Sequence, residues 1–350
     1  MKLRGVVVVE DAVPPSPSEG RITVPALEHV ANRPILDHVV DAMQLAGVEQ
    51  VIVAMPVAVA GRVRQSLDTR NDVAIRYLEH DGLFDLAAAI RGAGPLVGGA
   101  PCIIHRANGL LEEPLARFVN RLRDAPDALL VLHQGSTPHE QLSPAAQHML
   151  RVAQFNSDHA LGMTGVWLFG PGAMSIFDSS PLPPGGALDF TTLGKRIGAV
   201  GGAFHVELAE GWRQYRGRPL ELLELNRIVL DRLDSGLRSP VANGNRIEGR
   251  VRIHAAASVR ASVIIGPTVI GPGAQVTDSY IGPYTSIGER ARVEGAEVER
   301  SIISPGASVQ HLGGRLVASV VGRDARVFRD FSLPRALRLR VGDGTEVALC

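Results

Sequence analysis

Residues 263–288 read VIIGPTVIGPGAQVTDSYIGPYTSIG, and this stretch decides the fold of the C-terminal part of the chain. Aliphatic residues recur there in triplets offset by 17 residues, with internal steps of six, five and six. The triplets are Ile253, Val259 and Ile264; Ile270, Val276 and Ile281; and Ile287, Val293 and Val298, with Ile303, Val309 and Val320 continuing the series less regularly. A short period of this kind is typical of a β-solenoid. We predict a left-handed β-helix of hexapeptide-like repeats, in which each triplet forms one triangular coil with its aliphatic side chains inward.

Upstream of residue 240 the chain alternates short β-branched runs with amphipathic stretches. The predicted strands are Gly5–Val9, Gln50–Ala54, Ala74–Leu78, Pro101–His105, Ala128–Leu132, Gly165–Phe169 and Ala203–Leu208. The predicted helices are Ile35–Ala46, Val59–Leu67, Leu86–Gly92, Glu112–Asp124 and Leu220–Leu233. This alternation predicts an α/β fold with a doubly wound, mostly parallel sheet. We therefore expect an α/β domain at residues 1–240 and a β-helix domain at residues 241–350 that ends in a C-terminal cap.

The composition narrows the classes of function. The 36 basic residues balance the 36 acidic ones, which argues against a nucleic-acid-binding protein. No apolar run approaches the ~20 residues that cross a bilayer, so we expect no membrane partner. The two cysteines, Cys102 and Cys350, provide no disulfide framework, and we expect a cytoplasmic protein. Only two of the basic residues are lysine, Lys2 and Lys195, so any chemistry that needs an ammonium group has two candidates.

Several segments together resemble those of the sugar-1-phosphate nucleotidylyltransferases, above all the long-form glucose-1-phosphate thymidylyltransferases. They are VANRPIL at 30–36, GVWLF at 165–169, GW at 211–212, GRPLELLELNR at 217–227 and IGPYTSIG at 281–288. The resemblance spans nearly the whole chain and implies a nucleotidyltransferase-like α/β domain followed by a β-helix. The reaction that it implies joins a sugar-1-phosphate to the α-phosphorus of a nucleoside triphosphate and releases pyrophosphate.

The charged groups that this reaction needs are missing at the matching positions. Residues 10–21 read EDAVPPSPSEGR where the family has a glycine-rich phosphate loop, and prolines have no N–H to donate. The family's lysine after that loop falls on Pro25. Its two metal-binding aspartates fall on Ala107 and Tyr215, neither of which supplies the carboxylate oxygen that Mg²⁺ prefers. We therefore assign no catalytic residue, no metal ligand and no cofactor; Mg²⁺ is expected only if the protein is an active enzyme.

Part of a pocket remains in the sequence. The resemblance implies a residual sugar or nucleotide pocket that contains Asn108, Gly165, Asp189 and Trp212, and possible phosphate contacts at Arg21 and Arg106. Asn108 is equally consistent with a turn, since Asn-Gly is a common turn dipeptide, and Trp212 is consistent with packing.

Three functions fit these residues. The first is a family member that has lost catalysis and acts as a nucleotide-sugar-binding, regulatory or scaffold subunit, alongside an active paralogue and as a homo-oligomer through the β-helix. The second is an active thymidylyl- or guanylyltransferase with a rebuilt site, in which arginines bind the phosphates. The third is a hexapeptide-repeat acyltransferase with a histidine base, His254 or His311, although alternation along the strand places His254 on the outer face.

Overall fold

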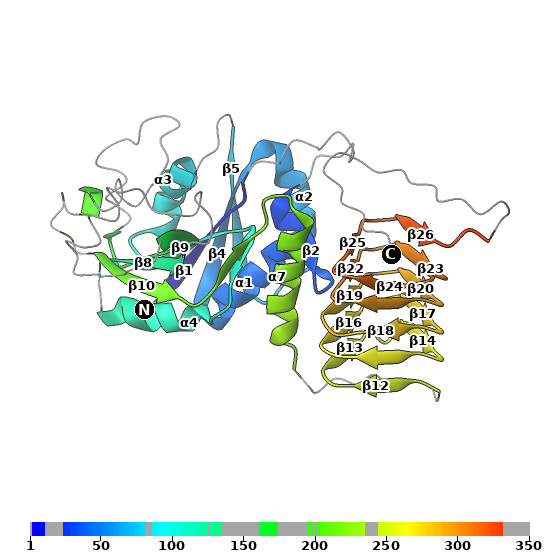
Figure 1. Ribbon diagram of the computed structural model, residues 1–350. Helices are drawn as coiled ribbons and strands as arrows, with labels where there is room; N and C mark the ends of the chain where they lie inside the picture. The colour runs from blue at the N-terminus through cyan, green and yellow to red at the C-terminus, as the bar shows by residue number, and fades with distance from the viewer. Residues whose placement is uncertain are drawn as a thin grey trace. The chain divides into compact units, whose positions relative to one another are not determined.

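The computed structural model (Figure 1) forms two compact units. The structure describes residues 2–10, 24–81, 86–124, 127–134, 161–173, 195–197, 199, 202, 204–234 and 244–331. The first unit contains β1, Val24–Leu27 and Ile35–Gln214, and the second contains Glu28–Pro34 and the chain from Tyr215 onward. The domain boundary at residue 240 marks where the sequence pattern changes and stays a prediction, whereas the two compact units divide before Tyr215.

The first unit is built on a mixed sheet with the order β10-β8-β9-β6-β1-β4-β5. Its strands are β1 (Leu3–Val8), β4 (Val48–Pro56), β5 (Ala74–His80), β6 (Cys102–Arg106), β8 (Ala128–Gln134), β9 (Leu161–Phe169) and β10 (Phe204–Ala209). Its helices are α1 (Ile35–Leu45), α2 (Val57–Leu67), α3 (Leu86–Val97), α4 (Leu115–Asp124) and the short η1 (Pro25–Leu27). Among the described strands of this sheet, only β9 runs antiparallel to its neighbours. The predicted α/β class and mostly parallel sheet are confirmed.

The strand order contains a reversal that matters for binding. From β1 the chain adds β4 and then β5 on one side, and it then returns to place β6 on the other side of β1. In open α/β sheets, ligands bind outside the carboxyl ends of the strands at such a switch point. The core beneath it is apolar and includes Val6, Val8, Ile104 and Trp167. The strand order therefore predicts a ligand-binding site at the carboxyl ends of β1 and β6.

The second unit contains stacked coils made of three parallel sheets (Figure 1). The first sheet is β12 (Arg246–Glu248), β15 (Val263–Ile265), β18 (Tyr280–Ile281), β21 (Glu297–Glu299) and β24 (Arg315–Val317). The second is β13 (Val251–Ile253), β16 (Thr268–Ile270), β19 (Thr285–Ile287), β22 (Ile302–Ile303) and β25 (Val320–Val321). The third is β14 (Ser258–Arg260), β17 (Gln275–Thr277), β20 (Arg292–Glu294), β23 (Ser308–Gln310) and β26 (Arg326–Phe328). This is the arrangement of a left-handed β-helix, as the repeat predicts.

The register explains where the repeat becomes irregular. Ile253 pairs with Ile270 and Ile270 with Ile287, so the early coils keep the 17-residue offset of the sequence. Ile287 then pairs with Ile303, 16 residues later, and Ile303 with Val321, 18 residues later. The prediction that Val320 continues the inward series is wrong by one residue. In this longer coil Val321, not Val320, pairs with the inward Ile303 and belongs to the core of the β-helix.

Helix α7 (Pro219–Asp231) packs within the second unit rather than the first. Its Asn226 is fully buried and donates from Nδ2 to the carbonyl of Tyr284, 3.1 Å away. The Asn226 Oδ1 accepts from the Ala31 N–H at 2.8 Å and from the Ser286 hydroxyl at 2.6 Å. Ala31 begins the turn of a hairpin of two short strands, β2 (His29–Val30) and β3 (Arg33–Pro34). One amide thus joins the hairpin, α7 and a corner of the β-helix.

None of the helices in the described part of the chain combines the length and the apolar character that a membrane crossing requires.

Candidate functional site

An ion pair spans the switch point of the sheet. Glu10 lies just beyond the end of β1, and Arg106 is the last residue of β6. The Arg106 Nη1 and the Glu10 Oε1 are 2.7 Å apart, and both side chains are about one third exposed, at 33% and 37%. The second Glu10 oxygen accepts from the Asn108 Nδ2 at 3.2 Å. A carboxylate therefore occupies the position where this class of fold commonly binds an anionic group.

The carboxylate belongs to a longer polar chain. Asn108 is buried in the turn between β6 and β7 (Gly109–Leu111), and its Oδ1 accepts from the Gln214 Nε2 at 3.2 Å. Gln214 ends β11 (Trp212–Gln214), which pairs antiparallel with β7. The order Gln214, Asn108, Glu10, Arg106 links three chain segments, which are the end of β11, the end of β6 with its following turn, and the end of β1. Asn108 thus lies in a turn and also contributes its amide to the site.

Trp212 packs closely at this end of the sheet. A Cβ on Gly165 would lie 2.6 Å from the Trp212 ring, and a Cβ on Gly109 would lie 2.5 Å from it. The ring also meets His105 edge-on, with the ring centroids 5.6 Å apart. Trp212 is 4% exposed, so its ring is a packing element here rather than an open stacking surface. The glycines are needed because only a hydrogen fits against the indole.

His105 is a neutral group beside the ion pair. Burial lowers the pKa of His105 to about 4, from an ordinary value of 6.5. The ring is therefore uncharged at neutral pH, and its Nδ1–H donates to the Arg106 carbonyl 2.7 Å away. Arg106 is thus the cation at the end of β6, and the histidine adds no charge to it.

The positions that match the family's catalytic groups hold no charged side chain. Ala107 is 1% exposed, and its backbone N–H donates to the carbonyl of Val8 at 2.9 Å. Tyr215, in the second unit, is buried, and Pro25 is buried in η1. Arg21 and Asp189 lie outside the described residues. The predicted sugar or nucleotide pocket (Asn108, Gly165, Asp189 and Trp212) and the predicted phosphate contacts (Arg21 and Arg106) therefore stay predictions.

The described residues do not form the donor set that Mg²⁺ requires. Mg²⁺ prefers carboxylates and substrate phosphates arranged octahedrally. At the switch point one carboxylate, Glu10, is already held by a guanidinium. Within the described ranges, no three His, Cys, Asp or Glu side chains are grouped as they would be around a metal ion. The described residues at the switch point therefore do not fit a Mg²⁺ ion.

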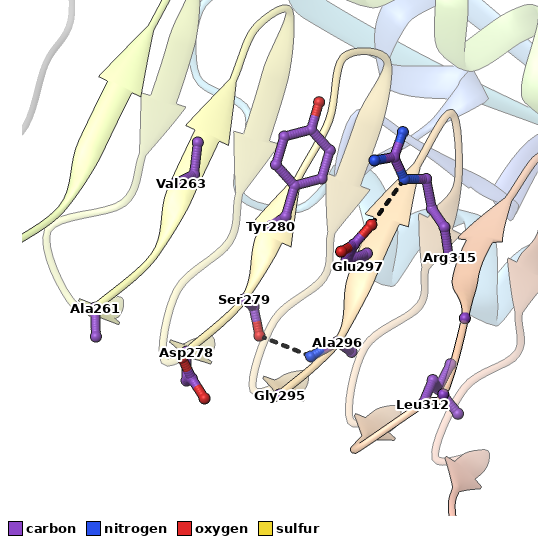
Figure 2. Close-up of a pocket in the computed structure, with 12 residues that line it drawn as sticks. Ala261, Val263, Asp278, Ser279, Tyr280, Gly295, Ala296, Glu297, Leu312 and Arg315 are labelled. Carbon is purple, nitrogen blue, oxygen red and sulfur yellow. Dashed lines mark hydrogen bonds and ion pairs between the residues drawn. The ribbon is translucent and has the colours of Figure 1, made fainter.

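A shallow groove of about 470 Å³ lies on the outer face of the β-helix. Figure 2 shows Tyr280, Glu297 and Arg315 on successive strands along it. Arg315 pairs with Glu297 at 2.9 Å and lies over the Tyr280 ring, 5.0 Å from its centroid, so these charges already satisfy one another. Neither His254 nor His311 lines this groove. His254 is exposed, as expected from alternation along the strand.

The fold has a counterpart among solved structures. No protein-family model matches the chain. A crystal structure from Bacillus anthracis, assigned as a glucose-1-phosphate thymidylyltransferase and holding sucrose, matches with a TM-score of 0.53 and 14% identity. It covers 65% of this chain and 94% of that one. The likeness shows the fold, a nucleotidyltransferase-like α/β sheet.

Sequence relatives match about nine tenths of the chain. A glucose-1-phosphate thymidylyltransferase of Streptomyces griseus is 29% identical over 321 residues, which are 90% of each chain. That of Streptomyces antibioticus is 28% identical over 91% of this chain and 92% of its own. The low-salt glycan biosynthesis nucleotidyltransferase Agl11 of Haloferax volcanii is 25% identical over the same shares. Over about nine tenths of its length the chain is thus similar to sugar-1-phosphate nucleotidylyltransferases.

Proposed function

We propose that this protein binds a sugar phosphate or a nucleotide sugar but does not catalyse nucleotidyl transfer, and that it acts as a regulatory or scaffold subunit. The observation that carries the proposal is the Glu10–Arg106 pair at the switch point, with the buried methyl group of Ala107 beside it. A family member with this substitution retains the fold of the binding site without the charged groups of the reaction.

The physical reason is electrostatic. Nucleotidyl transfer depends on positioning and on cations that neutralise the charge of the transferring phosphate. At the switch point the single positive charge of Arg106 is offset by the single negative charge of Glu10. A triphosphate that approaches this edge meets a carboxylate and gains no net cation. The local charge therefore disfavours the transition state of the family reaction.

Neutral hydrogen-bonding groups remain at the same edge. The Asn108 and Gln214 amides are ordered by one another and by Glu10. Carboxylates and amides are suitable partners for hydroxyl groups. This supports binding of the sugar part of a ligand, which the predicted pocket of Asn108, Gly165, Asp189 and Trp212 would provide.

The test has two parts. Pyrophosphate release is followed with Mg²⁺, glucose-1-phosphate and each nucleoside triphosphate, and no turnover is expected; turnover at an ordinary rate would refute the loss of catalysis. Calorimetry with thymidine and guanosine nucleotide sugars then measures binding with and without Mg²⁺. Binding that does not depend on the metal supports the sensor, and absence of binding to every ligand would leave the scaffold role alone.

An active nucleotidylyltransferase with a rebuilt site is the second candidate. The relatives from the two Streptomyces species favour it, since both are named thymidylyltransferases and match over nine tenths of the chain. In that case Mg²⁺ would be required and Arg106 would contact a phosphate. Turnover that Arg106→Gln abolishes would establish this candidate; turnover that survives it would exclude this role of Arg106.

Assembly and location complete the proposal. The β-helix would join copies of the chain, and an active paralogue is the partner of a regulatory subunit; a monomeric mass at micromolar concentration would contradict the homo-oligomer. A cytoplasmic location is proposed because the chain has two cysteines and so no disulfide framework. Nothing in the structure favours the acyltransferase hypothesis, whose two histidines are exposed.

A further inference from the structure

The Glu10–Arg106 pair resembles a receptor that already holds its anion. A guanidinium binds carboxylates and phosphates through the same donor geometry. Arg106 lies at the edge of the sheet where this class of fold binds anionic groups. Its partner there is the Glu10 carboxylate, which also accepts the Asn108 amide. One cation and one amide donor thus converge on a single negative group that belongs to the chain itself.

Arg106 is positioned by packing as well as by its ion pair. A Cβ on Gly165 would lie 2.9 Å from the Arg106 Cβ, so the stem of the arginine lies closely against the next strand. The guanidinium lies 5.8 Å from the centroid of the buried Trp167 ring. Loss of the Glu10 carboxylate would therefore leave the cation and the amide near their present places, with no anion between them.

We propose that Glu10 is an intramolecular substitute for an anionic ligand, and that it is the residue that excludes phosphate groups from Arg106. The excluded class is phosphate and pyrophosphate groups, whether free or esterified. The biological meaning of the exclusion rests on the proposed function, because a protein that binds without catalysis has no need of a triphosphate at this edge. The exclusion itself rests only on the geometry of Glu10, Arg106 and Asn108.

The charge count sets the expected effect. With Glu10 present the pair is neutral, and without the Glu10 carboxylate the positive charge of Arg106 is no longer offset by that partner. A pyrophosphate group bears several negative charges, so removal of the carboxylate both ends a repulsion and frees a bidentate donor. We expect at least about a tenfold gain in affinity for inorganic pyrophosphate, and we expect the gain to shrink as salt is added.

The experiment measures binding of inorganic pyrophosphate to the full chain by calorimetry without metal. Glu10→Gln keeps the shape of the side chain and removes its charge, and Glu10→Ala removes the carboxylate by a second route. The matched control is Glu79→Gln, because Glu79 accepts from the Arg64 Nε at 2.9 Å with similar exposure but lies on β5. Both Glu10 variants should gain affinity, and the control should not.

The double variant Glu10→Gln/Arg106→Gln identifies the receptor. The gain should disappear in it, because the guanidinium is gone. An unchanged affinity in both Glu10 variants, an equal gain in the Glu79 control, or a gain that survives the double variant would each overturn the proposal. These outcomes are separate from the proposed function, which is decided on the unaltered protein by pyrophosphate release and by nucleotide-sugar binding.

Discussion

Replacement of Asn226 by alanine should destabilise the second unit strongly, because one buried amide satisfies three groups. It accepts from the Ala31 N–H and the Ser286 hydroxyl, and it donates to the Tyr284 carbonyl. Asn226 and Ser286 are both fully buried, so water does not readily replace the amide. The change Asn226→Ala therefore leaves three polar groups without their partner.

The magnitude follows from those three groups. A buried donor or acceptor that loses its partner costs about 1–3 kcal/mol. Alanine is the better helix former and recovers at most about 0.7 kcal/mol in α7. The lower end of the range for three groups, less that gain, gives a loss of about 2 kcal/mol in the free energy of unfolding. This is a large fraction of the stability of an ordinary domain.

Urea unfolding followed by far-ultraviolet circular dichroism measures this loss, with the slope of the transition checked for constancy. Asn120→Ala is the matched control, because Asn120 lies on α4 and is exposed; it should change the free energy by no more than about 0.5 kcal/mol. Hydrogen exchange should also become faster at the Ala31 amide in Asn226→Ala. A loss below about 1 kcal/mol, or one no larger than that of the control, would refute the reasoning.

Other predictions concern single groups in the first unit. The His105 pKa of about 4 in the folded chain lies below the unfolded 6.5, so the unfolded state binds the extra proton between these values. The free energy of unfolding should therefore fall by about 3 kcal/mol as the pH drops through that window, and His105→Gln should flatten this part of the urea-midpoint profile. Gly109→Ala should cost about 1–3 kcal/mol, because its Cβ would meet an indole ring at 2.5 Å, whereas Gly61→Ala in α2, with nothing within 4 Å, should slightly raise the melting temperature. Burial raises the pKa of Cys102 to about 12, so in a Cys350→Ser variant a thiol reagent at pH 8 should react only after unfolding; rapid reaction of the folded variant would contradict this.

The repeat part of the fold could be predicted because each inward position reports directly on the period. Ile253, Ile270 and Ile287 stack in the structure as their spacing requires. The strand and helix order of the first unit also follows from hydrophobic pattern. Short strands outside the repeat, such as β2 and β7, could not be predicted, because a segment of two or three residues shows no period of its own. Helix α3 runs past the predicted end at Gly92 and contains Pro95, which local sequence rules treat as a helix breaker.

The candidate site was harder to predict because it depends on which strands are neighbours. Asn108 could be singled out from the resemblance, but its partner Glu10 is 98 residues away in the sequence. Glu10 and Asn108 come together because β1 and β6 are neighbours in the sheet, and a local sequence pattern does not predict which strands are neighbours. The low pKa of His105 could not be predicted for the same reason, since it arises from burial that includes packing against Trp212, far away in the sequence. A signal was present in Glu10, a carboxylate where the family has a phosphate loop.

The 16-residue and 18-residue offsets at the end of the β-helix have an evolutionary consequence. One coil is a residue shorter than the 17-residue period and the following coil is a residue longer, yet Ile303 and Val321 still stack on the same ladder. Each coil of such a structure contacts only the coils before and after it. A duplication of residues 263–279 would thus insert a coil with the same inward residues, Ile264, Ile270 and Val276. Duplications of this kind would change the number of coils one coil at a time. The sequence of the α/β sheet could change independently of the number of coils.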